Sequence, residues 1–136
     1  MISLISSAAC IARLSRFHYK FPCDSVAGFR RTDYKLKTEQ IDFIRNGSEN
    51  HLPGHLSLSF KNADGEALLH RLDLMGICVS TGAACDSKST QISHVLKAID
   101  LDESYAKGTI RISFGRDNTK EDAVDIADAL IRILKK

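Results

Sequence analysis

The sequence predicts an α+β fold made of short strands and amphipathic helices. Apolar and polar residues alternate over residues 56–60 and 109–114, which predicts two strands that each bury one face. Apolar residues recur at intervals of three and four over residues 68–75, 92–99 and 124–134, which predicts helices with one buried stripe. Together with a short strand between the first two helices, the elements follow the order β-α-β-α-β-α along the chain.

Turn and capping signals set the limits of the first helix. Asn62 or Asp64 is expected to cap it, and Gly76 is expected to end it in a left-handed conformation. The apolar run that follows predicts a short strand over residues 77–80. Cys78 lies in this run and is expected to fill core volume.

The two later helices also have clear start signals. Ser89 or Thr90 is expected to cap the second helix, and the sequence from Thr119 to Asp122 matches a capping box for the third. Gly108 precedes the last strand, in which Arg111 and Ser113 face away from the isoleucines.

The N-terminal part of the chain is less regular. Residues 1–39 are left unassigned apart from a helix expected near 11–17, and a short strand at 41–43 is expected to end in an Asn-Gly turn. Residues 1–23 contain three basic residues and no acid, a composition shared with organelle transit peptides, although an ordinary terminal helix explains it more simply.

Length and composition restrict the function classes. The chain has 136 residues, of which 43% are hydrophobic and 26% charged, enough for one compact core but not for two. A net charge of +2 without a lysine or arginine run argues against nucleic-acid binding, so we expect small molecules or proteins as partners. The N-terminus lacks the pattern of a secretory leader or a membrane span, so we expect a cytoplasmic protein with reduced thiols and no membrane partner.

The most informative cysteine is Cys85, which follows the small residues of 80–84 and precedes the polar stretch 86–90. No apolar neighbour encloses it, so the sequence predicts a solvent-reachable thiol whose reactivity depends on its thiolate fraction. An inert exposed cysteine and a protease-like cysteine–histidine pair are the alternatives, and His94 itself is expected at the helix surface or in packing. The four cysteines show no CxxC spacing, so no metal site is expected.

Arg111 is the second candidate, because it interrupts an apolar strand on its polar face. Its planar guanidinium suits a bidentate contact with a carboxylate. The alternative is an arginine that reaches solvent from the edge of the sheet.

Four motifs follow one another along the chain: Leu52-Pro53-Gly54-His55-Leu56-Ser57-Leu58-Ser59-Phe60, Ser80-Thr81-Gly82-Ala83-Ala84-Cys85, Ser93-His94-Val95-Leu96-Lys97-Ala98-Ile99 and Ile110-Arg111-Ile112-Ser113-Phe114-Gly115-Arg116. In sequence and spacing they resemble the cysteine desulfurases of the class V aminotransferase fold. The resemblance covers roughly two thirds of the chain. It implies that residues 40–136 are the C-terminal domain of such an enzyme, with helices packed on one side of a small, mostly antiparallel sheet.

The resemblance also implies chemistry. Cys85 would be the nucleophile that carries the persulfide, Arg111 would bind the carboxylate of substrate cysteine, and residues 86–90 would move the sulfur outward. The implied partners are a sulfur-acceptor protein, as in iron–sulfur cluster assembly, and a second copy in a homodimer. The implied cofactor is pyridoxal phosphate, which this family holds on a large preceding domain.

No counterpart of the cofactor domain is recognised in this sequence. Residues 18–20 read His-Tyr-Lys, whereas the family has adjacent histidine and lysine, so no cofactor-binding residue is expected here. We therefore expect no desulfurase activity without a cofactor-bearing large-domain chain, lost or supplied in trans. A non-catalytic persulfide carrier or interaction module and an inactive gene remnant are the alternatives.

Overall fold

The computed structural model describes residues 23–48, 54–81, 93–115 and 117–135, with the backbone alone for 23–29. The elements are α1 (Cys23–Thr38), β1 (Phe43–Arg45), β2 (His55–Phe60), α2 (Gly65–Leu74), β3 (Ser80–Thr81), α3 (His94–Ala98), α4 (Glu103–Ala106), β4 (Thr109–Ser113) and α5 (Lys120–Leu134). The strands of the described part form one antiparallel sheet in the order β1-β2-β4-β3. The predicted α+β fold with a small antiparallel sheet is confirmed.

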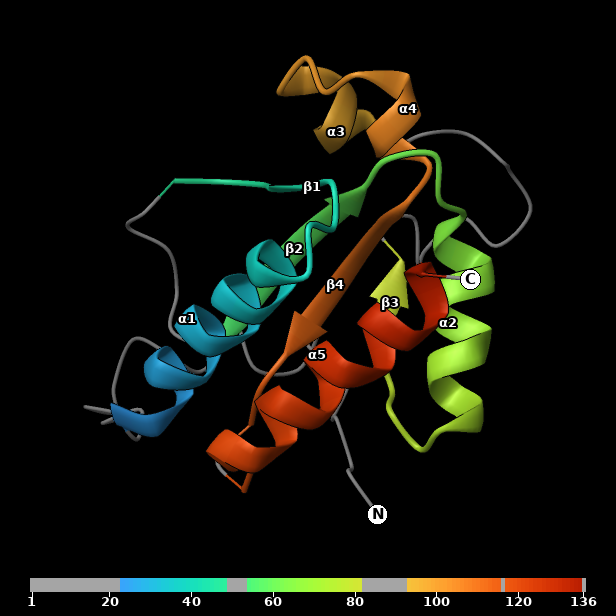
Figure 1. Cartoon of the computed structure of the whole chain (residues 1–136). Helices are drawn as coiled ribbons and strands as arrows, with labels where there is room; N and C mark the ends of the chain where they lie inside the picture. The colour runs from blue at the N-terminus through green and yellow to red at the C-terminus, as the bar shows by residue number, and fades with distance from the viewer. Residues whose placement is uncertain (1–22, 49–53, 82–92, 116, 136) are drawn as a thin grey trace.

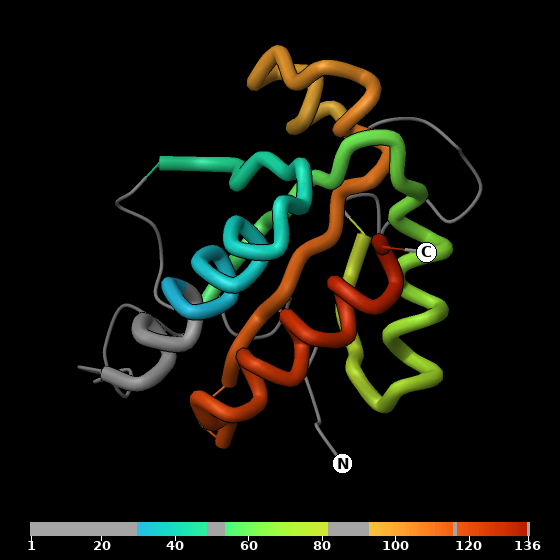
Figure 2. Tube along the Cα trace, viewed as in Figure 1, coloured from blue at the N-terminus to red at the C-terminus, as the bar shows by residue number. Residues whose placement is uncertain are grey.

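The helices and the sheet form two layers. Figure 1 shows α1 and α5 side by side across one face of the sheet, with α2 beside α5. The same arrangement is visible in the trace of Figure 2, where α3 and α4 lie beyond one end of the strands. No helix in the described ranges combines the length and apolarity needed to cross a membrane.

The hydrophobic core lies between these layers. The apolar residues of β2 and β4 alternate with polar ones and point toward the helices, where burial of each large aliphatic side chain contributes about 1.5–3 kcal/mol. The side chains that meet there from both layers are fully buried: Leu36, Leu56, Leu58, Phe60, Leu72, Ile110, Ile112, Ile126 and Leu130. The period-2 pattern predicted for both strands is thereby confirmed.

The predicted caps of α2 and α5 are also confirmed. The Asp64 carboxylate accepts a hydrogen bond from the amide of Glu66 at 2.9 Å, and Gly76 follows the helix with a φ of +77°. At α5, the amide of Asp122 donates to Thr119 Oγ1, and the amide of Thr119 donates to the Asp122 carboxylate. Such caps satisfy amides that the first turn leaves free.

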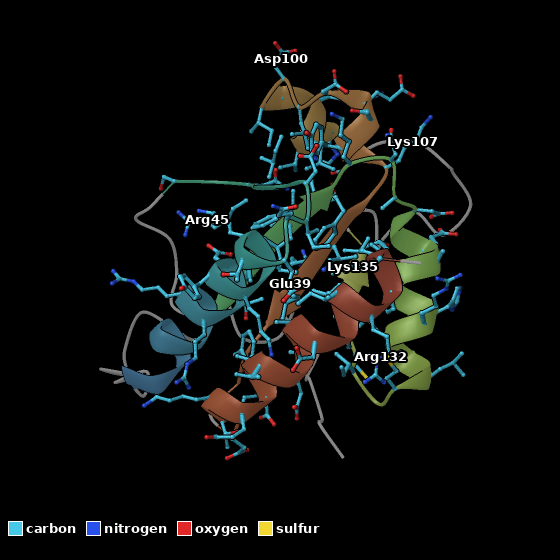
Figure 3. The ribbon with its side chains drawn as sticks, viewed as in Figure 1. Glu39, Arg45, Asp100, Lys107, Arg132 and Lys135 are labelled. Carbon is cyan, nitrogen blue, oxygen red and sulfur yellow. The ribbon has the colours of Figure 1, made fainter. Side chains whose placement is uncertain are left out.

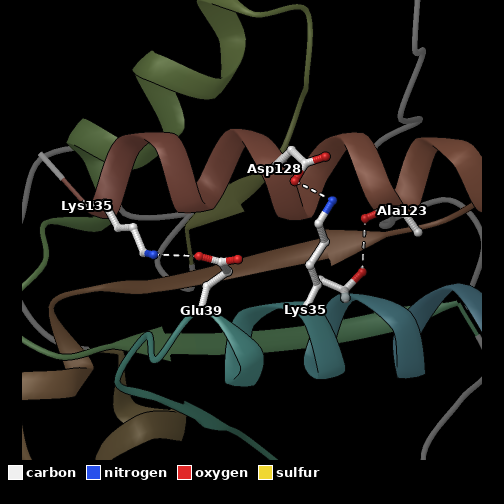
Figure 4. Close-up of polar contacts among 6 residues, drawn as sticks. Lys35, Glu39, Ala123, Asp128 and Lys135 are labelled. Carbon is white, nitrogen blue, oxygen red and sulfur yellow. Dashed lines mark hydrogen bonds and ion pairs between the residues drawn. The ribbon is translucent and has the colours of Figure 1, made fainter.

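Helix α1 was not predicted from the sequence, because polar residues form much of its contact with α5. Thr32 is fully buried and donates a hydrogen bond from its hydroxyl to the backbone carbonyl of Ala123 at 3.2 Å. Lys35 pairs with Asp128, and Figure 4 shows this contact between α1 and α5. The helix expected near residues 11–17 lies outside the described residues.

The second predicted helix is shorter than expected. Helix α3 is capped by Ser93, whose hydroxyl accepts from the amide of Val95, rather than by Ser89 or Thr90, which lie outside the described residues. Leu96 is buried, but the side chains of Val95 and Ile99 are 56% and 51% exposed. A five-residue helix at the end of the sheet has too little surface against the core to bury the whole predicted stripe.

The prediction that Cys78 fills the core was wrong. Ile77 is buried, Val79 is half-buried, and Cys78 between them is exposed. This segment leads into β3 at the edge of the sheet, where alternate side chains point away from the core. Strand β3 also begins further along the chain and is shorter than the strand predicted over residues 77–80, since it contains Ser80 and Thr81 alone.

Replacement of Gly108 by alanine tests the close approach of the chain between β2 and β4. A Cβ atom at Gly108 would lie 2.3 Å from the carbonyl oxygen of Phe60, a backbone atom that cannot move away without disturbing the strand. We expect Gly108→Ala to lower the free energy of unfolding by about 1–3 kcal/mol, measured by urea denaturation. Gly115→Ala is the control, because its nearest contact is a side-chain atom at 3.7 Å. Equal midpoints for the two variants would contradict this packing.

Candidate functional site

The face of the sheet opposite the helices carries a row of polar side chains. Residues directly opposite each other in an antiparallel pair project from the same face. Arg111 of β4 lies opposite Ser57 of β2 on one side and opposite Ser80 of β3 on the other. The sheet therefore places a guanidinium between two hydroxyl-bearing residues.

Arg111 has unused hydrogen-bonding capacity. Its side chain is half-buried, and its Nη2 atom donates to Ser80 Oγ at 3.5 Å, a long contact. Within the residues that the structure describes, no carboxylate forms an ion pair with Arg111. Since β4 lies between β2 and β3, this residue is on an interior strand, which contradicts the alternative of an arginine at the sheet edge. A guanidinium with free donors on an interior strand suits a carboxylate ligand.

A buried hydrogen-bond network lies next to this row. Asn46 donates from Nδ2 to Ser59 Oγ at 2.7 Å and to Ser57 Oγ at 3.1 Å. The hydroxyls of Ser59 and Thr109 are 2.6 Å apart, and Thr109 donates to the carbonyl of Tyr105 at 3.5 Å. If Ser59 donates to Thr109, the hydroxyl protons of Ser59 and Thr109 both have an acceptor. The network links β1, β2 and β4, so it holds Ser57 in place beside Arg111.

The network ends at a charged cluster on the surface. The Tyr105 hydroxyl donates to Asp42 Oδ1 at 2.8 Å, and Lys61 lies 3.3 Å from the other carboxylate oxygen and 5.7 Å from the Tyr105 ring centroid. The hydrogen bond from Tyr105 is the main cause that lowers the pKa of Asp42 and raises that of Tyr105. The pKa of Lys61 is raised, chiefly by its hydrogen bond to Asp42.

Cys85 lies outside the described residues, as does the stretch 86–90 that follows it. The structure does place the residues that lead to it, because β3 pairs with β4 through Ser80 and Thr81. His94 is exposed at the start of α3, in agreement with its interpretation as a residue of the helix surface. Among the described cysteines with a placed side chain, Cys78 is free and exposed.

The described residues do not fit a pyridoxal phosphate site. A Schiff base needs a lysine amine that is available beside the cofactor. Four lysines are instead engaged at the surface in ion pairs with acidic side chains: Lys35, Lys61, Lys107 and Lys135. Lys37 and Lys97 are exposed, and Lys120 is the first residue of α5.

The comparisons with known proteins agree on one family. The family model described as Aminotransferase class-V matches residues 12–126. The chain belongs to the class-V aminotransferase family. Among curated members of this family, it is 43% identical over 94 residues to "Cysteine desulfurase IscS" of Dictyoglomus turgidum and 37% identical over 127 residues to "Cysteine desulfurase" of Gluconacetobacter diazotrophicus.

These two alignments cover 69% and 92% of the present chain but only 24% and 32% of the relatives. Solved structures of class-V aminotransferase relatives also match most of this chain but only part of their own length. A NifS-like protein from Rickettsia africae superposes with a TM-score of 0.66 at 29% identity, and a second NifS-like protein superposes with a TM-score of 0.67 at 29% identity. The alignments cover 81% and 82% of this chain but 28% and 27% of those structures. The chain thus corresponds to between a quarter and a third of its relatives.

The network of Asn46, Ser59 and Thr109 is the part of this class-V aminotransferase domain that sequence reasoning missed. The alternation of serines with leucines in β2 is a signal that Ser57 and Ser59 share the polar face. That signal does not identify the partners, because the pairing of β2 with β4 joins residues about fifty positions apart. Asn46 was interpreted as a turn residue only.

The cluster of Asp42, Lys61 and Tyr105 predicts a pH dependence of stability. The lowered pKa of Asp42 gives a contribution that is present above its unfolded pKa, about 3.9, and is lost as the pH falls through the lower folded value. The raised pKa values of Tyr105 and Lys61 give contributions that are present below about pH 10 and lost as the pH rises through the folded values.

We therefore expect Tyr105→Phe to be less stable than the parent chain by a constant amount between about pH 5 and 9, with the difference shrinking at both extremes. Urea unfolding at a series of pH values measures this difference. Tyr34→Phe is the control, since that side chain is 73% exposed. A difference between parent and Tyr105→Phe that persists unchanged above pH 11, well past the ordinary tyrosine pKa of about 10, would contradict the assigned hydrogen bond.

Proposed function

We propose that this chain is the sulfur-accepting part of a cysteine desulfurase. In this proposal Arg111 binds the carboxylate of cysteine or of a cysteine-derived sulfur donor, and the thiolate of Cys85 takes up the sulfur atom as a persulfide. The observation that carries the proposal is the half-buried guanidinium of Arg111, without a carboxylate partner in the described part, beside the strand that leads to Cys85. The names of the curated relatives support the substrate class.

Arg111 is suited to hold a donor by its carboxylate group. Two parallel hydrogen bonds from a guanidinium to a carboxylate fix the orientation of the ligand as well as its position. The network around Ser59 fixes the neighbouring strand, so the hydroxyls of Ser57 and Ser80 remain on either side of the guanidinium. Preorganisation of this kind lowers the entropic cost of binding.

Chain connectivity supports the role of Cys85. It follows Thr81 by four residues, and four residues span at most about 14 Å even when fully extended. Thr81 is paired with Ile110, the neighbour of Arg111 in β4. A thiol on this tether is within reach of a ligand bound at Arg111, and the proposal requires it to reach an acceptor afterwards.

The sulfur transfer needs no redox partner when the donor is a persulfide. The Cys85 thiolate attacks the outer sulfur, a new sulfur–sulfur bond forms, and the old one breaks. The electron pair of the broken bond leaves with the donor as its thiolate. A thiolate of a sulfur-acceptor protein then attacks the outer sulfur of the Cys85 persulfide, and Cys85 leaves as its thiolate.

Activation of free cysteine requires chemistry that we assign to no described residue of this chain. We propose that a cofactor-bearing large-domain chain supplies it, and that the assembled protein forms a homodimer. A second candidate function is a persulfide carrier loaded by another enzyme, which would need no Schiff-base lysine in this chain. Both functions use Cys85 and Arg111 in the same roles.

Transfer from two small persulfides tests the two residues separately. Cysteine persulfide carries a carboxylate, whereas cysteamine persulfide does not. Since a hydrogen bond to a charged group contributes about 1.5–3 kcal/mol, we expect Arg111→Gln to slow labelling of Cys85 by cysteine persulfide about tenfold or more, and to leave labelling by cysteamine persulfide unchanged. Mass spectrometry of the labelled peptide measures both rates.

The controls for this experiment are Arg45→Gln and Cys78→Ala. Arg45 lies in the same sheet but pairs with Asp33, so its loss should not discriminate between the donors. Cys78 is exposed, so Cys78→Ala shows whether any accessible thiol is labelled as readily. Equal slowing by Arg111→Gln with both donors, or equal labelling of Cys85→Ala and Cys78→Ala, would refute the assigned roles.

The assignment of cofactor chemistry to another chain predicts the outcome of an alanine assay. With cysteine and added pyridoxal phosphate, we expect this chain alone to form no alanine, because the described lysines do not offer a Schiff-base site. Addition of a cofactor-bearing large-domain chain should restore alanine formation, and Cys85→Ala should abolish it again. Alanine formation by this chain alone would contradict the assignment. A lack of alanine formation in every mixture of this chain with a large-domain chain would also contradict it.

A further inference from the structure

An apolar groove lies between α2 and α5, in the helical layer. It has a volume of about 330 Å³ and is lined by Arg71, Leu74, Met75, Arg132 and Ile133. Figure 3 shows Arg132 extending from α5 toward α2. A second groove of about 260 Å³ continues along α2 toward its N-terminus and shares Arg71 and Ile133 with the first. The two grooves therefore form one depression along the length of α2.

Apolar side chains are unusually exposed at this depression. Leu74 is 88% exposed and Met75 is 44% exposed, at the point where Gly76 turns the chain away from α2. Ile133 of α5 lines the groove together with Leu74 and Met75. Exposed large aliphatic side chains beside a concave surface are typical of a binding site for another apolar side chain.

The two charged residues that line the first groove are both arginines, whereas the second groove is also lined by Lys61 and Asp64. Arg71 and Arg132 stand on the two walls of the first groove, and within the described residues neither forms an ion pair with an acidic side chain. Two lysines on the helical layer differ in this respect, since Lys35 is paired with Asp128 and Lys135 with Glu39. Two available guanidinium groups across an apolar floor attract a ligand that has carboxylates on either side of an apolar centre.

We propose that this groove, named here the α2–α5 groove, binds an acidic amphipathic segment of another protein. The segment places an aliphatic or aromatic side chain over Ile133, between Leu74 and Met75, and pairs its carboxylates with Arg71 and Arg132. Helix α2 has ten residues and is about 15 Å long, a length that matches about ten residues of a bound helix.

The N-terminal segment of this chain is unsuited to the groove. Residues 1–22 contain arginines and lysine but no acidic residue, so Arg71 and Arg132 would repel them. A membrane surface is also a poorer fit than a protein segment, because lipid headgroups meet convex apolar faces with several cations, whereas this surface is hollow and has two.

Binding of synthetic peptides to the full chain tests the proposal. The probe is a fluorescent helical peptide of about fourteen residues with leucines four positions apart and glutamates on both flanks. One matched peptide has lysine in place of glutamate, and another has serine in place of leucine. We expect the acidic peptide to bind, measured by fluorescence anisotropy, with an affinity that falls as salt is raised. The matched peptides should not bind.

Two sets of variants locate the binding surface. We expect the double variant R71E/R132E to bind the acidic peptide about tenfold more weakly or worse, and to gain affinity for the lysine peptide. Leu74→Ser should weaken binding without loss of fold, because the side chain is 88% exposed. Lys97→Glu and Val95→Ser are the controls, since they change an exposed cation and an exposed aliphatic residue on α3.

Four outcomes overturn the proposal. The first two are binding of the acidic peptide that R71E/R132E does not weaken, and an equal loss of peptide affinity in the α3 control variants. The third is binding of anionic phosphatidylserine vesicles without binding of the acidic peptide. The fourth is a dimer of this chain that Leu74→Ser dissociates. Circular dichroism of each variant confirms that it is folded. None of these measurements depends on Cys85 or Arg111, so they stand independently of the sulfur-transfer proposal.

Discussion

The pairing of β2 with β4 is the constraint on which the rest of the structure depends. The two strands meet over five residue pairs, from His55 opposite Ser113 to Ser59 opposite Thr109. Because side chains alternate between faces, this register sends every large apolar residue of both strands toward the helices. A slip of one residue in either strand would expose that strand's apolar residues and bury its polar ones, so the hydrophobic core and the candidate site are fixed by the same register.

The polar face follows from the same pairing, but it is stabilised differently. Apolar burial is not directional, whereas the network of Asn46, Ser59 and Thr109 requires each donor to meet an acceptor. Loss of one member would leave a buried hydroxyl unsatisfied, at a cost of about 1–3 kcal/mol. The network thus makes the position of Arg111 relative to Ser57 specific, while the core beneath it supplies most of the stability.

Features that depend on neighbouring residues could be predicted from the sequence, and features that depend on distant contacts could not. Asp64 caps a helix and Gly76 ends it because of the conformations that these residues adopt, and both were predicted. Thr32 lies in a helix whose buried face is completed by a carbonyl of α5, a contact that no local pattern reveals. Cys78 has apolar neighbours and was expected inside, but its strand lies at the sheet edge. Arg111 was assigned to the polar face of its strand, while its interior position depends on sheet order.

The two surfaces proposed to bind ligands lie on opposite layers of the domain. Arg111 projects from the face of β4 that is turned away from the helices, whereas the α2–α5 groove lies within the helical layer. Ile110 and Ile112, which flank Arg111 in β4, point into the core that Leu72 of α2 and Ile133 of α5 also enter. A partner seated in the groove would therefore leave the Arg111 face open to a small donor. The sheet separates the two proposed ligands sterically, so the two proposals are compatible with each other.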